Sequence, residues 1–247
     1  MVHVRIGIIG TSWWADTMYL PSLAGSEKAI VVACCGRNEE RARKLAEIWI
    51  IPKVYTDWQT MLNEEPLDAL IISTTNSTHC PITLAALEKG LHVLCEKPLA
   101  LNYAEAKRML ESSQIHQAVT MVPFTYSFVP MAQTIKRLLS EGYLGKLHHL
   151  NFRYYANFGR SPEYHWRFNK KLAGSGSLGD VGSHFLYLAV WFFGEVTHVF
   201  AELDTVIERP KLDPSEQPYV QADDFSIVIL TFANGAKGVV QASTVAH

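Results

Sequence analysis

Over the first 123 residues, short and nearly continuous apolar runs alternate with stretches in which apolar positions follow a helical period. The apolar runs predict strands at 4–10, 29–35, 53–55, 67–75, 91–96 and 117–122. The periodic stretches predict helices at 12–25, 38–49, 57–64, 78–90 and 102–114. We expect Pro21 to interrupt the first helix, Asp57 to cap the third and Gly90 to end the fourth. Apolar strands separated by helices indicate a parallel sheet covered on both faces, and therefore an α/β domain over residues 1–123.

The pattern changes after this point. A helical period covers 129–142, and alternating positions predict strands at 146–158 and 196–206. A polar, aromatic loop at 159–173 precedes a helix that runs through Trp191. Asn234 and Gly235 stand between two further apolar runs, which is a strong β-hairpin signal. Residues 124–247 are therefore expected to form an α+β domain on a largely antiparallel sheet.

Composition narrows the class of protein. The chain has 22 Lys and Arg against 24 Asp and Glu, so no basic surplus indicates a nucleic-acid partner. The longest strongly apolar stretch, 185–194, is about half the ~20 residues that a membrane span needs. The N-terminus enters a strand pattern directly, so we expect no signal peptide. The four cysteines show no metal-ligand spacing, and we expect no metal site and reduced thiols in a cytoplasmic protein.

The turn after the first strand carries part of a dinucleotide-binding fingerprint. The pattern is G-x-G-x-x-G/A between a strand and a helix, and this chain has Gly10, Ser12 and Ala15 at the three fixed positions. Ser12 replaces the glycine that lets the backbone approach a pyrophosphate. Gly10, Thr11, Ser12 and Trp13 are the candidate phosphate-loop residues; the alternative is an ordinary strand-to-helix turn.

Two further patterns carry candidate chemistry. Lys97 follows a buried strand and precedes Pro98, and ligands of open parallel sheets bind at the carboxyl ends of the strands. Asp180 and His184 are four residues apart and share one helix face. Each has a structural alternative: Lys97 as a solvated strand end, Asp180 as part of a capping box with Ser177, and His184 as a core histidine.

Together these motifs resemble the Gfo/Idh/MocA oxidoreductases, the family of glucose–fructose oxidoreductase and inositol dehydrogenase. The resemblance rests on the fingerprint at Gly10, on Glu-Lys-Pro at 96–98 and on the segment 166–184. It implies a Rossmann NAD(P)-binding domain at 1–123, followed by a substrate and oligomerisation domain at 124–247 whose open sheet often packs between subunits. It also implies hydride transfer between NAD(P) and a hydroxyl or carbonyl carbon, commonly of a sugar or cyclitol.

Residue by residue, the resemblance makes Lys97, Asp180 and His184 the catalytic set. It places Asn76 and His79 in the loop near the nicotinamide, and Thr74 and Glu96 join the candidate cofactor-binding residues. His184 is the leading base and Lys97 the group that stabilises the reacting oxygen, although these two roles could be exchanged.

The chain departs from the family pattern in several places. Thr125-Tyr126-Ser127 stands where the family often has Asn-Tyr-Arg, and Tyr187 where an aspartate is common. These changes put the usual polyol substrates in doubt. The chain also ends before the family's sheet is complete, so we expect the second domain to be incomplete. Trp166 and Arg167 are interpreted as either packing or substrate contacts.

The end of the second strand bears on cofactor choice. Gly36 occupies the place where NAD-selective folds carry an acidic residue for the ribose 2′-hydroxyl, and Arg37 follows it. A guanidinium can pair with a 2′-phosphate, so NADP is expected to be preferred over NAD. The alternative is that Glu39 or Glu40 serves the ribose. The competing function is a non-catalytic NADP-binding regulator of the same fold, which would need the phosphate loop but not Lys97, Asp180 and His184.

Overall fold

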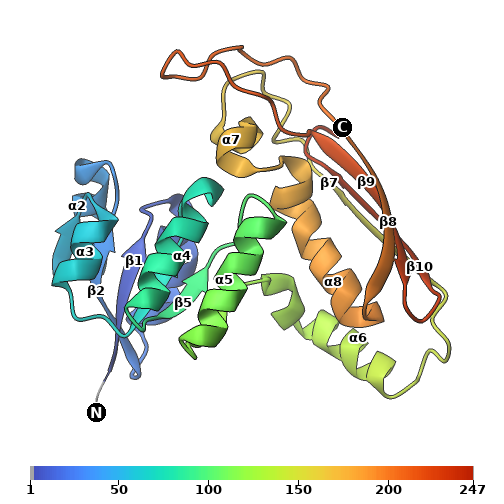
Figure 1. Cartoon of the computed structure of the whole chain (residues 1–247), viewed down its shortest axis with the longest axis horizontal. Coiled ribbons are helices and arrows are strands. Elements are labelled where there is room, and N and C mark those ends of the chain that lie inside the picture. Colours follow the sequence, from blue (N-terminus) through green and yellow to red (C-terminus); the bar gives the residue numbers. More distant parts are fainter. Residues whose placement is uncertain (1–2, 247) are drawn as a thin grey trace. The chain divides into compact units, whose positions relative to one another are not determined.

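The computed structural model describes residues 3–246 and divides the chain into two compact units, with the division between Pro123 and Phe124. Each unit is built on its own sheet (Figure 1). Among the described residues, no helix is long and apolar enough to cross a membrane.

The first unit contains a six-stranded parallel sheet in the order β3-β2-β1-β4-β5-β6. Its strands are β1 (Val4–Ile9), β2 (Ala29–Cys35), β3 (Lys53–Tyr55), β4 (Ala69–Ile72), β5 (His92–Cys95) and β6 (Thr120–Met121). The chain builds outward from β1 to β3 and then returns to β4 on the other side of β1. The carboxyl ends of β1 and β4 therefore form the point where strand order reverses, which is where open α/β sheets bind ligands.

Helices cover both faces of this sheet. They are a π turn (Ala15–Tyr19) continuing into α1 (Leu20–Ala24), α2 (Glu39–Trp49), α3 (Trp58–Glu64), α4 (His79–Glu88) and α5 (Tyr103–Ile115). Successive residues of β1 serve opposite faces: Ile8 packs with side chains of α1 and α2, whereas Ile9 packs with α3, α4 and α5. This confirms the predicted sheet with two covered faces.

Local sequence signals explain several helix boundaries. The Asp57 side chain accepts a hydrogen bond from Thr60 N–H at 2.7 Å, as predicted for the cap of α3. The predicted interruption at Pro21 is wrong, because the helix continues through this residue. The π turn that ends at Tyr19, just before Pro21, has a wider hydrogen-bond spacing, and it accommodates a residue that lacks an N–H donor.

The second unit contains a four-stranded sheet in the order β7-β10-β9-β8. Its strands are β7 (His149–Tyr155), β8 (Val196–Asp204), β9 (Phe225–Phe232) and β10 (Lys237–Ser243). β9 pairs antiparallel with both β8 and β10, but β10 runs parallel to β7. The sheet is therefore mixed, with two of its three pairings antiparallel as expected. The β9–β10 hairpin at Asn234 and Gly235 is confirmed, and Gly235 adopts a φ of +86°.

Helical segments complete the second unit. They are a 3₁₀ turn (Thr125–Phe128), α6 (Pro130–Ser140), a 3₁₀ turn (Trp166–Phe168), α7 (Lys170–Ala173), and a π turn (Leu178–Gly182) that leads into α8 (Ser183–Phe193). Residues of α8 pack with the inner face of the sheet, where Val228, Leu230 and Phe232 of β9 are buried. The alternate residues Ile227 and Ile229 are exposed on the outer face.

Candidate functional site

Gly10 ends β1 in a conformation and a space that only glycine fits. Its φ is +110°, and a Cβ atom there would lie 2.1 Å from the carbonyl oxygen of Ser73. Hydrogen bonds hold the neighbouring strand ends together, from Gly10 N to Cys35 O at 2.9 Å and from Ser73 N to Ile9 O at 2.8 Å. The first glycine of the fingerprint thus hydrogen-bonds to the end of β2 and packs against the residue that follows β4.

The serine in the middle of the fingerprint interacts locally. Ser12 Oγ lies 3.3 Å from Ser73 Oγ and accepts a hydrogen bond from Ala15 N at 3.4 Å. Trp13, the next residue, is 65% exposed. Ser12 therefore provides a hydrogen-bond acceptor at the start of the helix, and the Trp13 ring is exposed on the surface of the unit.

Glu96 joins the helix after this loop to the end of β5. The carboxylate is 7% exposed and accepts hydrogen bonds from Trp14 Nε1 at 2.6 Å, from the Tyr19 hydroxyl and from Lys97 N at 3.0 Å. Burial and the charge of Glu96 raise the pKa of Tyr19, which keeps its hydroxyl protonated as the donor. The sequence analysis did not identify Trp14 and Tyr19 as site residues. The sequence signal that could have found them was Glu96, because an acidic residue directly after a buried strand needs hydrogen-bond donors.

Lys97 follows at the carboxyl end of β5, where its side chain is partly buried. The Lys97–Pro98 peptide bond is cis.

His79 is the first residue of α4 and directly follows the loop after β4. Its ring has no exposed surface, with Nδ1 3.0 Å from Pro98 O and Nε2 3.3 Å from Thr74 O. Burial lowers the pKa of His79, so the ring is neutral at pH 7. His79 thus links the residues after β4 to those after β5 through backbone atoms. Asn76, in the same loop, is also buried.

Gly36, directly after β2, packs against Thr11 of the candidate phosphate loop. A Cβ atom at Gly36 would lie 2.6 Å from Thr11 Cγ2 and 2.7 Å from Thr11 Oγ1. Arg37 is exposed. Glu39 and Glu40 occupy the first turn of α2, and Glu39 pairs with Arg43 at 2.6 Å. The ion pair with Arg43 indicates that Glu39 stabilises α2 and is not a residue that binds a ribose.

In the second unit, Asp180 lies in the π turn and His184 in the first turn of α8. The capping-box alternative is wrong, because Ser177 makes no side-chain cap hydrogen bond. Instead Asp223, next to β9, accepts hydrogen bonds from Gly176 N and Leu178 N, each at 2.7 Å. Burial raises the pKa of Asp223, while these two bonds oppose the rise.

Asp180 and His184 have different surroundings. Asp180 Oδ2 lies 3.3 Å from Arg167 Nε, and the Arg167 guanidinium stacks over Trp166 at 4.6 Å. His184 is 9% exposed, and its ring lies 4.6 Å from the ring of Tyr126. The helix therefore carries a carboxylate paired with a cation and, one turn later, an imidazole among aromatic rings.

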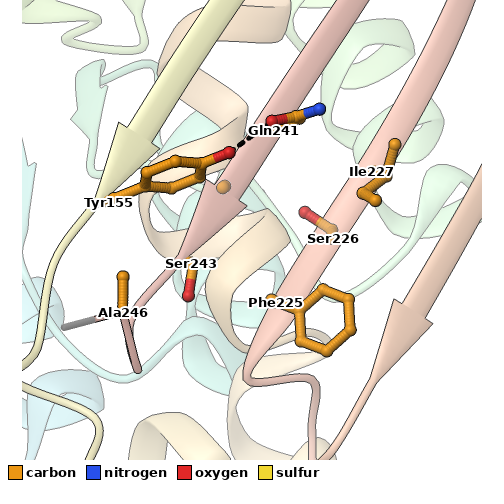
Figure 2. A pocket seen from close by; sticks show the side chains of 8 residues that line it. Tyr155, Phe225, Ser226, Ile227, Gln241, Ser243 and Ala246 are labelled. Atoms are coloured by element: carbon orange, nitrogen blue, oxygen red, sulfur yellow. Dashed lines mark hydrogen bonds between the residues drawn. The ribbon is translucent and has the colours of Figure 1, made fainter.

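Two cavities of the second unit differ in their lining residues. One of about 360 Å³ is lined by the residues around Asp180, namely Phe158, Ser161, Glu163, Tyr164, His165, Arg167, Phe168 and Asp180. The other, of about 250 Å³, lies over the sheet, where the Tyr155 hydroxyl donates to Gln241 (Figure 2). No candidate residue lines this second cavity. Within residues 3–246, no group of three or more His, Cys, Asp or Glu side chains is arranged to hold a metal.

A buried ion pair supports the segment that carries the larger cavity, and sequence reasoning missed it. Arg209 Nη2 lies 2.8 Å from Asp224 Oδ1, and neither side chain is exposed. Arg209 also donates to Gly159 O at 2.6 Å and lies 3.6 Å from the centre of the Phe168 ring. The pair therefore joins the start of β9 to the loop before Trp166.

Comparison with known families agrees with this architecture. A family described as "Oxidoreductase family, NAD-binding Rossmann fold" matches residues 4–124, and the "GFO/IDH/MocA C-terminal domain" matches residues 132–247. The chain belongs to the GFO/IDH/MocA oxidoreductase family, which confirms the resemblance and the fold class inferred from its motifs.

Individual relatives are sugar and cyclitol dehydrogenases. Levoglucosan dehydrogenase of Pseudarthrobacter phenanthrenivorans is 34% identical over 227 residues, which cover 85% of this chain and 58% of that protein. The NADP(+)-dependent scyllo-inositol 2-dehydrogenase IolU of Bacillus subtilis is 29% identical over 92% of this chain and 76% of its own length. A solved levoglucosan dehydrogenase in complex with NADH matches the whole chain with a TM-score of 0.89 and 31% identity, over 68% of the solved chain. The present chain thus spans about three-fifths to three-quarters of these relatives.

Proposed function

We propose that this protein is an NADP-preferring oxidoreductase that acts on a hydroxyl or carbonyl carbon of a sugar, cyclitol or related small molecule. The observation that carries the proposal is the edge of the first sheet, where Gly10 fits only as glycine and the Glu96 carboxylate binds both the adjoining helix and the backbone N–H of Lys97. The named sugar and cyclitol dehydrogenases among the relatives support the substrate class.

The first unit has residues that fit a dinucleotide. Gly10, Thr11, Ser12 and Trp13 would hold the pyrophosphate at the start of the helix, where backbone N–H groups favour an anion. Gly36 and Arg37 would receive the 2′-phosphate, since Gly36 carries no carboxylate and Arg37 is exposed. Thr74 and Asn76 would border the nicotinamide. His79 and Glu96 would hold the backbone of the loops after β4 and β5 in place through their contacts with Thr74, Lys97 and Pro98.

The chemistry requires a proton acceptor and an oxygen-stabilising group. The bound nicotinamide supplies the exchange of a hydride with the substrate carbon. His184 accepts the hydroxyl proton, and Lys97 donates a hydrogen bond to the reacting oxygen and stabilises its developing charge. Asp180 accepts hydrogen bonds from substrate hydroxyls. Its pairing with Arg167 fixes the orientation of the carboxylate.

We also propose that the protein is cytoplasmic and associates through the outer face of its second sheet. All four cysteines are buried and free, and free thiols are usual in proteins of a reducing compartment. Ile227, Ile229 and Phe200 supply exposed apolar side chains on this sheet. Sedimentation at micromolar concentration distinguishes an oligomer from a monomer.

The decisive experiment assays NADPH formation against a panel of neutral sugars, cyclitols and their phosphates. Lys97→Met and His184→Ala are each expected to lower kcat by about 10²-fold or more, the usual scale for positioned acid–base groups. Their cofactor affinity, measured by titration, should change little. Activity within a few-fold of wild type in both variants would remove the catalytic assignment. Cofactor binding without turnover of any substrate would favour the regulator instead.

A further inference from the structure

The cavity beside Asp180 has a lining of aromatic and polar side chains. It lies wholly within residues 158–180 and measures about 360 Å³, near the lower end of the roughly 300–1,000 Å³ typical of small-molecule sites. Asp180 forms part of its wall, but His184, the proposed base, does not. The cavity therefore adjoins the carboxylate proposed to bind substrate hydroxyls without containing the proposed base.

The walls offer flat apolar surfaces that are held in place. Phe158 is 52% exposed at the cavity although it is an aromatic residue. The ring of Tyr164 is fixed by a hydrogen bond from Asn169 Nδ2 to its hydroxyl oxygen at 3.3 Å, and it meets Tyr219 edge-on at 5.3 Å. Because the face of an aromatic ring is electron-rich, it packs well against the C–H groups along one face of a sugar ring.

The polar groups include both donors and acceptors. The Nδ1 atom of His165 accepts a hydrogen bond from Arg167 N at 3.3 Å, so the proton of the neutral ring is on Nε2, which can donate. Burial and the charge of Arg167 lower the pKa of His165, which keeps that ring neutral at pH 7. Glu163 and Asp180 supply carboxylate acceptors. Hydroxyl groups, which both donate and accept, suit this mixture.

The charges argue against an anionic ligand. The cavity contains two carboxylates, from Glu163 and Asp180, and one guanidinium, from Arg167. That guanidinium already pairs with Asp180 at 3.3 Å. A phosphate or an acidic sugar would meet two like charges with only one shared cation, whereas a neutral polyol meets no repulsion.

We propose that this cavity binds a neutral sugar ring attached to the ring that is oxidised, so that the substrate is a glycoside or disaccharide. The inference rests on the proposed function and extends it from a substrate class to a two-part substrate. Phe158 and Tyr164 provide the stacking surfaces, and His165, Glu163 and Asp180 bind the hydroxyl groups.

The test compares free hexoses and pentoses with their methyl glycosides, their disaccharides and their phosphates. In the wild type, kcat/KM should be at least about tenfold higher for a disaccharide than for the corresponding free sugar, with the phosphate poorest. Phe158→Ala should raise KM for the disaccharide about fivefold to tenfold, the scale of one aromatic contact, and leave kcat and the free-sugar kcat/KM unchanged. Tyr143→Ala, which truncates another exposed aromatic side chain outside the cavity, should change neither.

Equal kcat/KM for free sugars and disaccharides, preference for a phosphate, or equal loss on both substrates in Phe158→Ala would overturn the proposal. Saturation-transfer NMR with the same disaccharides separates this failure from failure of the proposed function. If turnover is absent but disaccharide binding is detected and is weaker in Phe158→Ala than in wild type or Tyr143→Ala, the cavity assignment stands and the oxidoreductase proposal fails. If no disaccharide binds, the cavity assignment fails.

Discussion

The indole of Trp14 donates a hydrogen bond to the carboxylate of Glu96 at 2.6 Å, joining residues 82 positions apart. The same carboxylate accepts from the Tyr19 hydroxyl and from Lys97 N. One buried acidic side chain thus connects the helix after the phosphate loop to the strand end that carries the proposed active-site lysine.

Replacing this carboxylate tests the connection. Glu96→Gln keeps the shape but turns an amide N–H₂ toward groups that are themselves donors, so we expect a loss of about 1.5–3 kcal/mol in the free energy of unfolding. The thermal midpoint should fall by about 2–4 °C per kcal/mol, and cofactor affinity should fall with it. Glu111→Gln, in an exposed pair with Lys107 at 3.8 Å, is the control and should cost less than about 1 kcal/mol. Equal midpoints for the two variants would contradict the connecting role of Glu96.

His79 predicts a specific dependence of stability on pH. Because burial lowers its pKa in the folded state below the ordinary value of 6.5, the unfolded chain binds the proton more readily. The stabilising contribution of neutral His79 is therefore complete above pH 6.5 and is lost as the pH falls toward the lowered pKa. His79→Gln should be less stable than wild type by about 1–3 kcal/mol at pH 7, and this difference should narrow by up to about 1.4 kcal/mol per pH unit on acidification.

Urea unfolding of both proteins between pH 5 and 7 checks this expectation. His148→Gln, at an exposed histidine, serves as the control and should keep the wild-type profile. A gap between wild type and His79→Gln that widens toward pH 5 would show that the sign is wrong.

Cofactor preference should depend on three residues. Arg37→Ala is expected to weaken NADP binding by about 1.5–3 kcal/mol, the range for hydrogen bonds to charged groups, with little effect on NAD. Gly36→Asp should weaken both cofactors, because its Cβ would lie 2.6 Å from Thr11 Cγ2 and displace the loop. Gly36→Asp combined with Thr11→Ala should recover NAD but not NADP. Calorimetric titration of both cofactors into all variants measures these differences. Tighter NAD than NADP binding by wild type would refute the assignment.

Breaking the Arg209–Asp224 pair should destabilise the fold far more than breaking a surface pair. Asp224→Asn leaves the guanidinium buried without its counter-charge, and breaking such a pair costs about 3–5 kcal/mol. Arg209→Met combined with Asp224→Asn should be less destabilised than Asp224→Asn alone, because no charge remains buried and the amide oxygen can still accept from Val206 N and Ile207 N. Arg137→Ala, in an exposed pair with Glu141 at 2.9 Å, should cost less than about 1 kcal/mol. Thermal unfolding of the four proteins provides the comparison, and a single variant as stable as Arg137→Ala would contradict it.

Much of the fold could be predicted because the signals are local. Continuous apolar runs defined the strands of the first sheet, and Asn234-Gly235 defined the hairpin between β9 and β10. Pro21 misled the prediction, since the π turn before it depends on hydrogen bonds that a residue pattern does not display. The parallel pairing of β7 with β10 was also missed, because those strands are far apart in the sequence.

The candidate site was predictable where a motif marks it and not where packing builds it. Lys97 and Asp180 stand in recognisable strings. The partners that hold them do not: Trp14 and Tyr19 reach Glu96 across the sheet edge, and Asp223 caps a helix some 45 residues earlier. Such contacts depend on the order of the strands in the sheet. The periodicity of apolar residues in a sequence predicts strands and helices but not that order.

The contact between Gly36 and Thr11 has a consequence for the history of such proteins. An aspartate introduced at Gly36 first would disrupt the phosphate loop before it could favour another cofactor. Replacing Thr11 by a smaller residue removes the two nearest atoms, Cγ2 and Oγ1, and leaves Arg37 in place, so this change creates the space that a side chain at Gly36 needs. Descendants that changed their cofactor through this strand end would therefore have acquired the two substitutions in a fixed order, Thr11 before Gly36.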